Sequence, residues 1–188
     1  MVRDSARDSI LDAAQAVVLE RGAGHVTLEA VAERAGLSKG GVLYHFQNKD
    51  AMLSALVDRM VRMFQSVVAE KRKALGDDPE RTLEAHVEAV FSMGDQTMND
   101  AACAMLPALA TNPVLLEPLR SFYRDHYGEL SNSTVGPYQS AVVSLALDGL
   151  WLMEMLQISP LTEDDEAKIK LMLLRLASKP LPKSFTPN

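Results

Sequence analysis

Several features are scarce in this chain of 188 residues, and each scarcity narrows the classes of protein to which it can belong. A single cysteine excludes a disulfide within the chain and is typical of a reducing compartment. No apolar run reaches the roughly 18 residues of a membrane-spanning helix, so we expect no contact with a membrane. Residues 1–5 lack an apolar signal segment, and we therefore expect a cytoplasmic protein.

Positive charge is also scarce. The chain has 19 Lys and Arg residues against 25 Asp and Glu residues, which gives a formal net charge of −6. A chain of this charge does not coat nucleic acid indiscriminately, because the phosphates repel it. Binding to DNA would have to come from a basic surface confined to one part of the chain.

Motifs of catalysis and metal binding are missing as well. There is no nucleophile elbow, phosphate loop or paired-carboxylate motif, and no two of the four histidines stand four residues apart. We therefore expect no enzyme activity, no cofactor and no metal site. Cys103 lies in an apolar stretch without a basic neighbour, which favours a buried small side chain over a redox sensor.

Residues 27–49 carry the pattern around which the chain is organised. Thr27 is placed to cap a first helix, whose apolar positions recur at helical spacing. Gly36 follows as a C-terminal glycine, and Ser38 is placed to cap a second helix. Two short helices joined by a tight glycine turn make a helix-turn-helix motif.

The second of these helices has two unusual properties. Gly40 and Gly41 each cost about 1 kcal/mol in helix propensity, which is tolerable where a partner such as DNA must approach the backbone closely. Residues 34–49 contain three basic residues and no acidic one. Lys39 is a donor suited to base edges or phosphates. The alternative is a helical hairpin with an ordinary exposed polar face.

Fifteen positions in and just after this segment fit one family pattern. They are Thr27, Val31, Ala32, Ala35, Gly36, Leu37, Ser38, Gly40, Leu43, Tyr44, His45, Phe46, Asn48, Lys49 and Leu53. The run resembles the DNA-binding domain of the TetR (tetracycline repressor) family. The resemblance covers residues 5–55 at the level of motifs; beyond them it rests on length and an all-helical pattern.

The hydrophobic pattern predicts an all-α fold of about nine helices. We expect residues 1–50 to form a three-helix DNA-binding domain that contains the helix-turn-helix motif. We expect residues 51–188 to form a helical regulatory domain with a ligand pocket and a dimer interface. The predicted helices are 5–21, 27–36, 38–47, 48–73, 82–93, 100–110, 112–127, 138–158 and 162–177.

The last two predicted helices are apolar on more than one face. This indicates that a second copy of the chain covers the apolar surface that a single chain leaves exposed. A four-helix bundle across two chains is the expected interface. Its predicted members are Leu145, Leu152, Leu156, Ile169, Met172, Leu173 and Leu176. The resemblance independently implies dimerisation through these helices, and a monomeric core is the alternative.

Methionine is frequent in the predicted regulatory domain, and aromatic side chains lie near the methionines in the helical pattern. The chain has ten methionines, and methionine adapts to apolar ligands of varied shape. The predicted pocket residues are Met60, Phe64, His86, Phe91, Met105, Phe122, Tyr123 and Trp151. His126 and Glu154 are further candidates for polar contacts. Plain core packing is the alternative for any one of them.

Motif and resemblance together predict a ligand-responsive DNA-binding transcriptional regulator, and specifically a repressor. Its expected partners are a double-stranded DNA operator, a small apolar effector and a second copy of the chain. Lys39 and Leu43 would face base edges. The resemblance implies that Thr27, Tyr44, His45 and Lys49 hold phosphates. Ser38, Gly40 and Gly41 complete the predicted DNA-binding set, and the two glycines would allow close approach. The alternatives are an all-helical small-molecule-binding protein and a protein-interaction adaptor without DNA readout.

Overall fold

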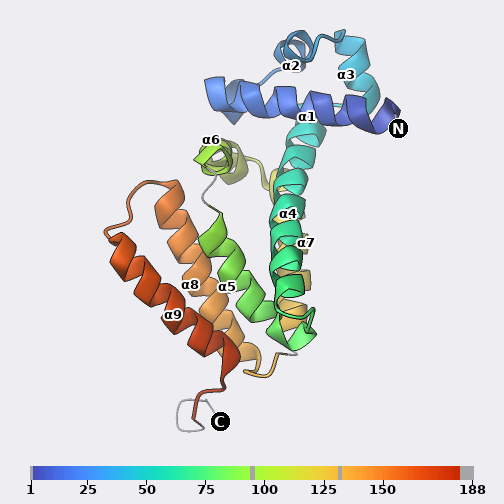
Figure 1. Cartoon of the computed structure of the whole chain (residues 1–188). Helices are drawn as coiled ribbons and strands as arrows, with labels where there is room; N and C mark the ends of the chain where they lie inside the picture. Colours follow the sequence, from blue (N-terminus) through green and yellow to red (C-terminus); the bar gives the residue numbers. More distant parts are fainter. Residues whose placement is uncertain (1, 94–95, 131–132, 183–188) are drawn as a thin grey trace. The chain divides into compact units, whose positions relative to one another are not determined.

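The structure, a computed structural model, describes residues 2–93, 96–130 and 133–182. Every regular element in these ranges is helical, and nine of them are α-helices, which confirms the predicted fold class (Figure 1). The α-helices are α1 (Val2–Arg21), α2 (Leu28–Ala35), α3 (Lys39–His45), α4 (Lys49–Ala74), α5 (Thr82–Ser92), α6 (Gln96–Thr111), α7 (Glu117–Leu130), α8 (Pro137–Met155) and α9 (Glu163–Ser178). Three 3₁₀ helices join them: η1 (Ala23–His25), η2 (Pro79–Arg81) and η3 (Pro113–Leu116).

The helix ends follow local signals in the sequence. Thr162 and Asp165 form a reciprocal capping box at the start of α9, as their spacing predicts. Asp78 caps η2 with Pro79 in the first helical position. The predicted ends differ where such signals are weak: α1 already begins at Val2, α6 begins at Gln96, and α8 ends at Met155.

The described residues group into two compact units. The first unit comprises residues 1–62 and 96–121, and the second comprises residues 63–95 and 122–188. The helix α4 is continuous and contributes residues to both units. The first unit therefore reaches beyond the motif-based boundary at residue 50, because it also holds the first half of α4 together with α6 and η3. The division into domains 1–50 and 51–188 stays a prediction.

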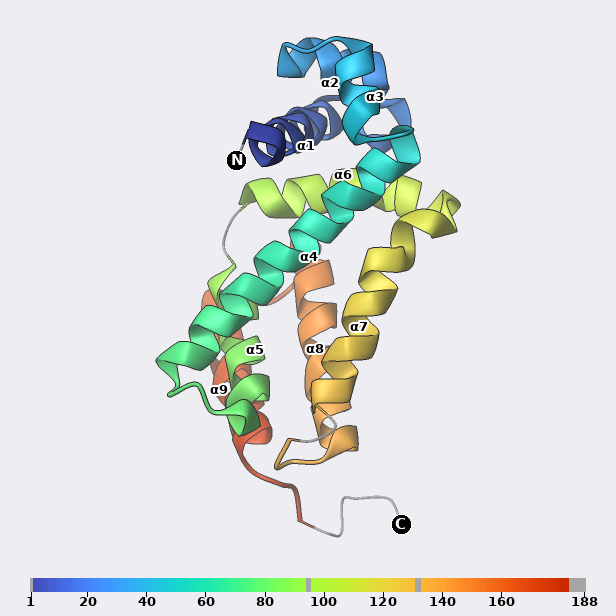
Figure 2. The same ribbon diagram turned by 90° about the vertical axis from the view of Figure 1, so that its right-hand side faces the viewer.

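In the first unit, α2 packs against α1 and α3, and α6 packs against α1 and η1 (Figure 2). A shared apolar core holds them together, and its most buried members include Ile10, Val31, Val42, Leu53 and Met105. Burial of one such side chain stabilises the fold by about 1.5–3 kcal/mol. The motif is thus one face of a packed body rather than a free hairpin.

In the second unit, α5 contacts both α8 and α9, and α8 lies beside α9 (Figure 1). Their core contains Leu83, Val87, Val143, Leu147 and Leu173. The buried Gln139 fastens the end of α9 to α8: its amide donates to the carbonyls of Leu176 and Lys179 at 2.6 and 2.7 Å. These bonds satisfy C-terminal carbonyls that a helix leaves without partners.

Candidate DNA-reading surface and effector cluster

Both helices of the motif are capped by the residues that the sequence indicates. The Thr27 hydroxyl accepts from the amide of Ala30 at 3.1 Å, and the Ser38 hydroxyl accepts from the amide of Gly41 at 3.0 Å. Gly36 has a φ of 67°, a left-handed conformation that favours glycine. Thr27 fixes where α2 begins, Gly36 fixes where it ends, and Ser38 fixes where α3 begins, so the turn between the two helices is set by local contacts.

The two glycines of α3 are not required by packing within the chain. A Cβ at Gly40 would lie 3.8 Å from the Ser38 hydroxyl, and one at Gly41 would lie 3.5 Å from it, which are ordinary contact distances. The fold would accept alanine at both positions and would gain helix propensity from it. Close approach by DNA at these glycines stays a prediction.

The predicted reading residues lie on an accessible surface. Lys39, Leu43 and Tyr44 are exposed, Tyr44 by 68%, and the His45 ring meets the Tyr44 ring edge-on with centroids 5.2 Å apart. The Lys49 ammonium donates to the carbonyl of Gly24 at 2.8 Å and so joins α4 to η1. Donors of different kinds thus surround α3, as a phosphate-contacting surface needs.

Two contacts in the first unit escaped the sequence analysis. The Lys39 ammonium lies 2.6 Å from the Glu29 carboxylate of α2. Arg59 of α4 donates to the carboxylate of Asp12 at 2.6 Å and to the side-chain oxygen of Gln15 at 2.7 Å, both on α1. Each contact joins residues on separate helices, which periodicity along one helix does not reveal.

The second unit contains a cluster of aromatic and imidazole rings, which we call the ring cluster. Its members are Phe64 of α4, His86 of α5, and Phe122, Tyr123, His126 and Tyr127 of α7. Four of these six, Phe64, His86, Phe122 and Tyr123, are predicted pocket residues. The rings of His86 and His126 are 4.3 Å apart, and the His126 ring stacks on Phe122 at 5.3 Å.

Both histidines of the cluster are buried and neutral. Burial, with the neighbouring His126, lowers the pKa of His86 to about 3, and burial lowers that of His126 to about 4. Among the described residues, Nδ1 of His86 and Nε2 of His126 have no hydrogen-bond partner. A buried polar atom without a partner costs about 1–3 kcal/mol, so a ligand that supplies one would bind favourably.

A carboxylate lies beside these rings. The Tyr123 hydroxyl is hydrogen-bonded to Asp148 of α8, which the sequence analysis did not single out. Burial raises the pKa of both groups, and the hydrogen bond opposes the shift at Asp148. Asp148 also raises the pKa of Tyr127, after the larger effect of burial. The cluster therefore combines apolar rings, two neutral imidazoles and one acid.

The remaining predicted pocket residues lie elsewhere. Met60 and Met105 belong to the first unit, and Met105 is fully buried in its core. Phe91 packs against the core of the second unit, with the Lys170 ammonium 5.9 Å from its ring centre. Trp151 is partly buried on α8. A pocket role for these four stays a prediction, and the ring cluster is defined without them.

One face of α8 is apolar and exposed. Val142 and Leu145 are each 62% exposed, Leu152 is 42% exposed and Leu156 is 38% exposed, whereas the opposite face enters the core. On α9, Met172 is 63% exposed and its neighbour Leu171 is 58% exposed. We call these six residues the apolar stripe.

One predicted interface residue must be corrected. Leu173 is only 5% exposed and lies in the core of the second unit, because it points inward from α9. Ile169 and Leu176 are half-buried against the same core. In an unbroken apolar run, the periodicity leaves open which residues face inward.

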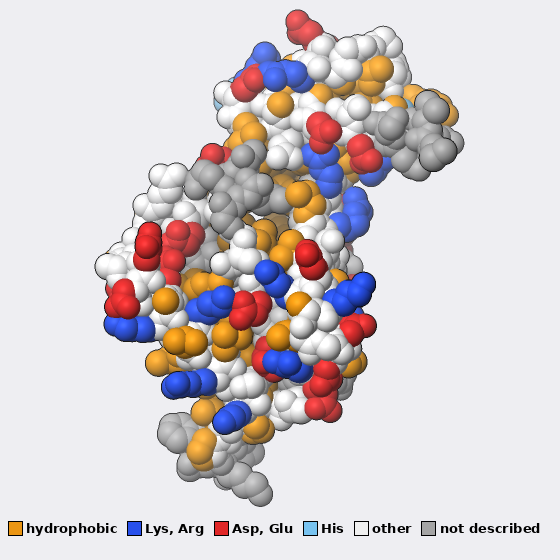
Figure 3. Space-filling view, in the orientation of Figure 1, with side chains coloured by type: hydrophobic (Ala, Val, Ile, Leu, Met, Phe, Trp, Pro, Cys, Tyr) orange, Lys and Arg blue, Asp and Glu red, His pale blue; other side chains and the backbone are white. Residues whose placement is uncertain are grey.

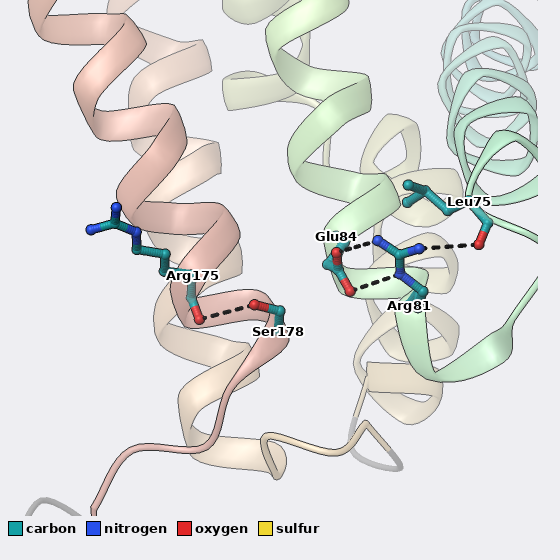
Figure 4. Close-up of polar contacts among 5 residues, drawn as sticks. All are labelled: Leu75, Arg81, Glu84, Arg175 and Ser178. Atoms are coloured by element: carbon teal, nitrogen blue, oxygen red, sulfur yellow. Dashed lines mark hydrogen bonds and ion pairs between the residues drawn. The ribbon is translucent and has the colours of Figure 1, made fainter.

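A groove of about 310 Å³ runs between α5 and α9. Its lining residues are Leu75, Arg81, Glu84, Glu88, Leu171, Leu174, Arg175 and Ser178. Figure 4 shows that the Arg81 guanidinium is held by Glu84, at 3.0 and 2.7 Å, and by the carbonyl of Leu75 at 3.2 Å. Acidic and basic side chains alternate with apolar ones over this face (Figure 3). No predicted pocket residue lines the groove.

Metal-ligand clusters and membrane-spanning helices are both absent from the described residues. No three His, Cys, Asp or Glu side chains in residues 2–93, 96–130 and 133–182 converge as metal ligands. Over the same ranges, none of the helices combines the length and the apolar character needed to cross a bilayer.

The fold and the motif define a helix-turn-helix regulator, and sequence profiles agree. The profile described as "Bacterial regulatory proteins, tetR family" matches residues 10–56. That described as "Tetracyclin repressor-like, C-terminal domain" matches residues 80–178. The chain belongs to the TetR family of ligand-responsive, DNA-binding transcriptional regulators.

Individual relatives cover nearly the whole chain. The HTH-type transcriptional regulator BetI of Burkholderia mallei (strain NCTC 10229) is 30% identical over 182 residues, which cover 90% of this chain and 91% of that protein. A TetR-family structure from Streptomyces coelicolor A3 has 27% identity and a TM-score of 0.73, with coverage of 91% and 97%. The multidrug binding protein EbrR, complexed with imidazole, has 26% identity and a TM-score of 0.70, with coverage of 94% and 91%.

Proposed function

We propose that this chain is a homodimeric repressor that leaves a pseudo-palindromic DNA operator when a small, largely apolar molecule binds at the ring cluster. The observation that carries the proposal is the capped helix α3, whose glycines have no packing role and whose exposed side chains are suited to DNA. Lys39 and Leu43 contact base edges in the major groove. Thr27, Tyr44, His45 and Lys49 hold phosphates and set the register.

Dimerisation supplies the affinity that one motif lacks. Residues 34–49 carry only three basic residues, in a chain of net charge −6. Two motifs related by a twofold axis bind two half-sites, and the second binding event is then intramolecular. The apolar stripe on α8 and α9 supports this arrangement, since a second copy would cover the same six side chains in return.

The ring cluster supports the effector site. It gathers aromatic rings from α4 and α7 around two buried imidazole nitrogens that lack hydrogen-bond partners within residues 2–93, 96–130 and 133–182. Ligand sites in proteins are mostly apolar, with a few polar groups that orient the ligand. The structural relative EbrR is described as a multidrug binding protein, and its structures include complexes with proflavin and ethidium.

The charges around the cluster favour an aromatic cation over an aromatic anion. Asp148 offers a counter-charge, and the faces of Tyr123 and Tyr127 attract cations. An anion would face the Asp148 carboxylate and would need a proton on an imidazole that burial keeps neutral. Proflavin and ethidium intercalate into DNA, so tetraphenylphosphonium and its anionic isostere tetraphenylborate are cleaner probes.

Coupling between the sites runs through α4. Its residues Met60 to Phe64 are where the helix passes from the first unit to the second. A ligand that displaces this segment shifts the dimer between two forms, provided that it binds one form more tightly. Arg59 supports this route, because its hydrogen bonds to Asp12 and Gln15 couple a movement of α4 to a movement of α1.

Selection from a randomised duplex pool by the purified full chain, at two salt concentrations, tests the proposal. Recovery of a pseudo-palindrome with a steep salt dependence is expected, because each phosphate contact releases counterions. Recovery of no sequence by folded, dimeric protein would contradict it and would favour an adaptor role for the apolar stripe.

Thermal-shift measurements with the two isosteric ions test the effector class. Tetraphenylphosphonium should raise the melting temperature of the chain more than tetraphenylborate does. Asp148→Asn should make this difference in melting temperature smaller.

A further inference from the structure

Three side-chain atoms of the second unit are buried without a hydrogen-bond partner in the part of the chain that the structure describes. They are Nδ1 of His86 on α5, Nε2 of His126 on α7 and the hydroxyl oxygen of Ser144 on α8. The three residues are only 3%, 7% and 1% exposed. Because buried polar atoms in folded proteins are normally paired, unpaired atoms gathered in one unit point to a bound molecule that completes them.

These unpaired atoms lie near one carboxylate. The rings of His86 and His126 are 4.3 Å apart. Tyr123, which is hydrogen-bonded to Asp148, stands three residues before His126 on α7, so the two side chains share one face of that helix. Ser144 stands four residues before Asp148 on α8 and shares its face in the same way. The fold therefore brings the Asp148 carboxylate to the region of the unpaired atoms.

The aromatic side of the ring cluster is accessible to solvent. Phe64, Phe122 and Tyr127 are each partly exposed, whereas the histidine rings that they contact are buried. An aromatic ligand that reaches the imidazoles therefore also finds rings on which it can stack.

The hydrogen-bonding capacity of these groups favours donors on the ligand. A carboxylate only accepts, whereas a neutral imidazole and a hydroxyl can each accept or donate. Burial, with the neighbouring His126, lowers the pKa of His86 to about 3, and burial lowers that of His126 to about 4, so each ring keeps one nitrogen free to accept at neutral pH. A ligand with donors alone can satisfy the whole set, whereas a ligand with acceptors alone would oppose the Asp148 carboxylate.

We propose that the effector is an aromatic cation that carries N–H donors, and that His86, His126 and Ser144 accept hydrogen bonds from it. This inference rests on the proposed effector site and narrows its ligand class. An amidinium, like a guanidinium, offers several N–H donors and no acceptor. A quaternary cation matches the charge of Asp148 but leaves the three unpaired atoms without partners.

The test compares biphenylcarboxamidinium with its N-permethylated analogue, which keeps the charge and the rings but has no N–H group. Isothermal titration calorimetry at neutral pH measures the binding of each ion to the full chain. We expect wild type to bind the amidinium at least about tenfold more tightly, because hydrogen bonds from a charged donor are strong. His86→Leu and His126→Leu should each reduce this advantage severalfold, whereas the control His25→Leu, in η1, should keep it.

Nitrogen NMR of the full chain labelled at histidine separates hydrogen bonding from a difference in ligand size. The amidinium should shift the resonances of Nδ1 of His86 and Nε2 of His126 in the direction of an accepted hydrogen bond, and the analogue should not. Unmoved resonances or equal affinities of wild type for the two ions would each overturn the inference. An advantage that both histidine variants keep would also overturn it, since water would then already pair these nitrogens.

The outcome with tetraphenylphosphonium distinguishes this inference from the proposed effector site. If tetraphenylphosphonium stabilises the chain but the amidinium has no advantage over its analogue, the aromatic-cation site stands and the requirement for N–H donors is wrong. If neither the amidinium nor tetraphenylphosphonium binds, the proposed effector site itself is wrong.

Discussion

The reading surface of the first unit and the ring cluster of the second treat polar side chains in opposite ways. Around α3 the polar groups are exposed and already engaged: Lys39 with Glu29, and Lys49 with the carbonyl of Gly24. In the ring cluster, Nδ1 of His86 and Nε2 of His126 are buried and have no partner among the described residues.

The difference shows how each site obtains its binding energy. A surface that meets DNA exchanges water and weak contacts for phosphates and bases, so its affinity depends on charge and salt. In a buried cluster, folding has already removed water from the polar atoms. A ligand that forms hydrogen bonds with these atoms does not have to displace water from them, so each new bond contributes more to the binding free energy. We expect changes at α3 to alter salt dependence and changes at the cluster to alter pH dependence.

The largest effect is expected from introducing a charge into the apolar stripe. The charge should prevent dimerisation, and the operator affinity that comes from linking two motifs would then be lost. Leu152→Asp should yield a monomer and weaken operator binding on the order of a hundredfold. Sedimentation and anisotropy measure the two consequences. Val114→Asp is the matched control, because Val114 is 63% exposed but lies in η3 of the first unit. A dimeric Leu152→Asp protein would show that the interface lies elsewhere.

Substitutions around α3 should separate base readout from phosphate contact. Lys39→Ala should relax the preference at one base pair of each half-site, a loss of about 2 kcal/mol in discrimination. Tyr44→Ala should weaken all duplexes to a similar extent, since a phosphate contact carries no sequence information. Repeating the duplex selection with each variant measures both. Equal losses on every sequence for the two variants would contradict the assignments.

A smaller effect is expected at Gly40. Gly40→Ala should raise the free energy of unfolding by about 0.5–1 kcal/mol, because its Cβ meets only the Ser38 hydroxyl at 3.8 Å. Operator affinity should fall about tenfold, or about 1.4 kcal/mol, because the Cβ lies where DNA approaches. Gly128→Ala in α7 is the control: it should stabilise the fold without weakening DNA binding. Unchanged operator affinity for Gly40→Ala would remove close approach as the reason for the glycine.

The smallest effect is expected from the histidines of the ring cluster. Their pKa values are about 3 and about 4 in the folded chain, against about 6.5 when unfolded, so the unfolded chain takes up protons first as the pH falls. Stability is therefore full above pH ~6.5, and each histidine lowers it by about 1 kcal/mol at pH ~5.5. The raised pKa of Asp148 acts in the opposite sense.

Urea unfolding at neutral and mildly acid pH measures this dependence. His126→Phe should remove its share of the acid sensitivity and keep the stacking on Phe122. His25→Phe, at an exposed position in η1, should leave the dependence unchanged. If His126→Phe keeps the full acid sensitivity, the ring is not buried as described.

Features determined within a few residues of the chain were the ones that the sequence could reveal. The caps Thr27 and Ser38 each act on an amide three residues away, and both were identified correctly. Gly36 ends α2 for an equally local reason. These residues define the motif, and the motif alone was sufficient to identify the family.

Features that join separate helices needed the structure. Tyr123 and Asp148 stand on α7 and α8, and no periodicity along either helix pairs them. The orientation of Leu173 failed for a related reason: residues 171–174 are all apolar, so hydrophobicity alone does not separate the inward Leu173 from the outward Met172. Contacts between helices, rather than patterns within them, form the ring cluster.

The claim that one chain reads DNA at α3 and senses a ligand at the ring cluster is tested by a single titration. Operator binding is followed by anisotropy for wild type and Phe122→Ala, with and without tetraphenylphosphonium. We predict equal affinities without the ion, and a loss of about tenfold on its addition for wild type alone, a coupling of about 1.4 kcal/mol. An equal loss for both proteins, or none for wild type, would contradict the account.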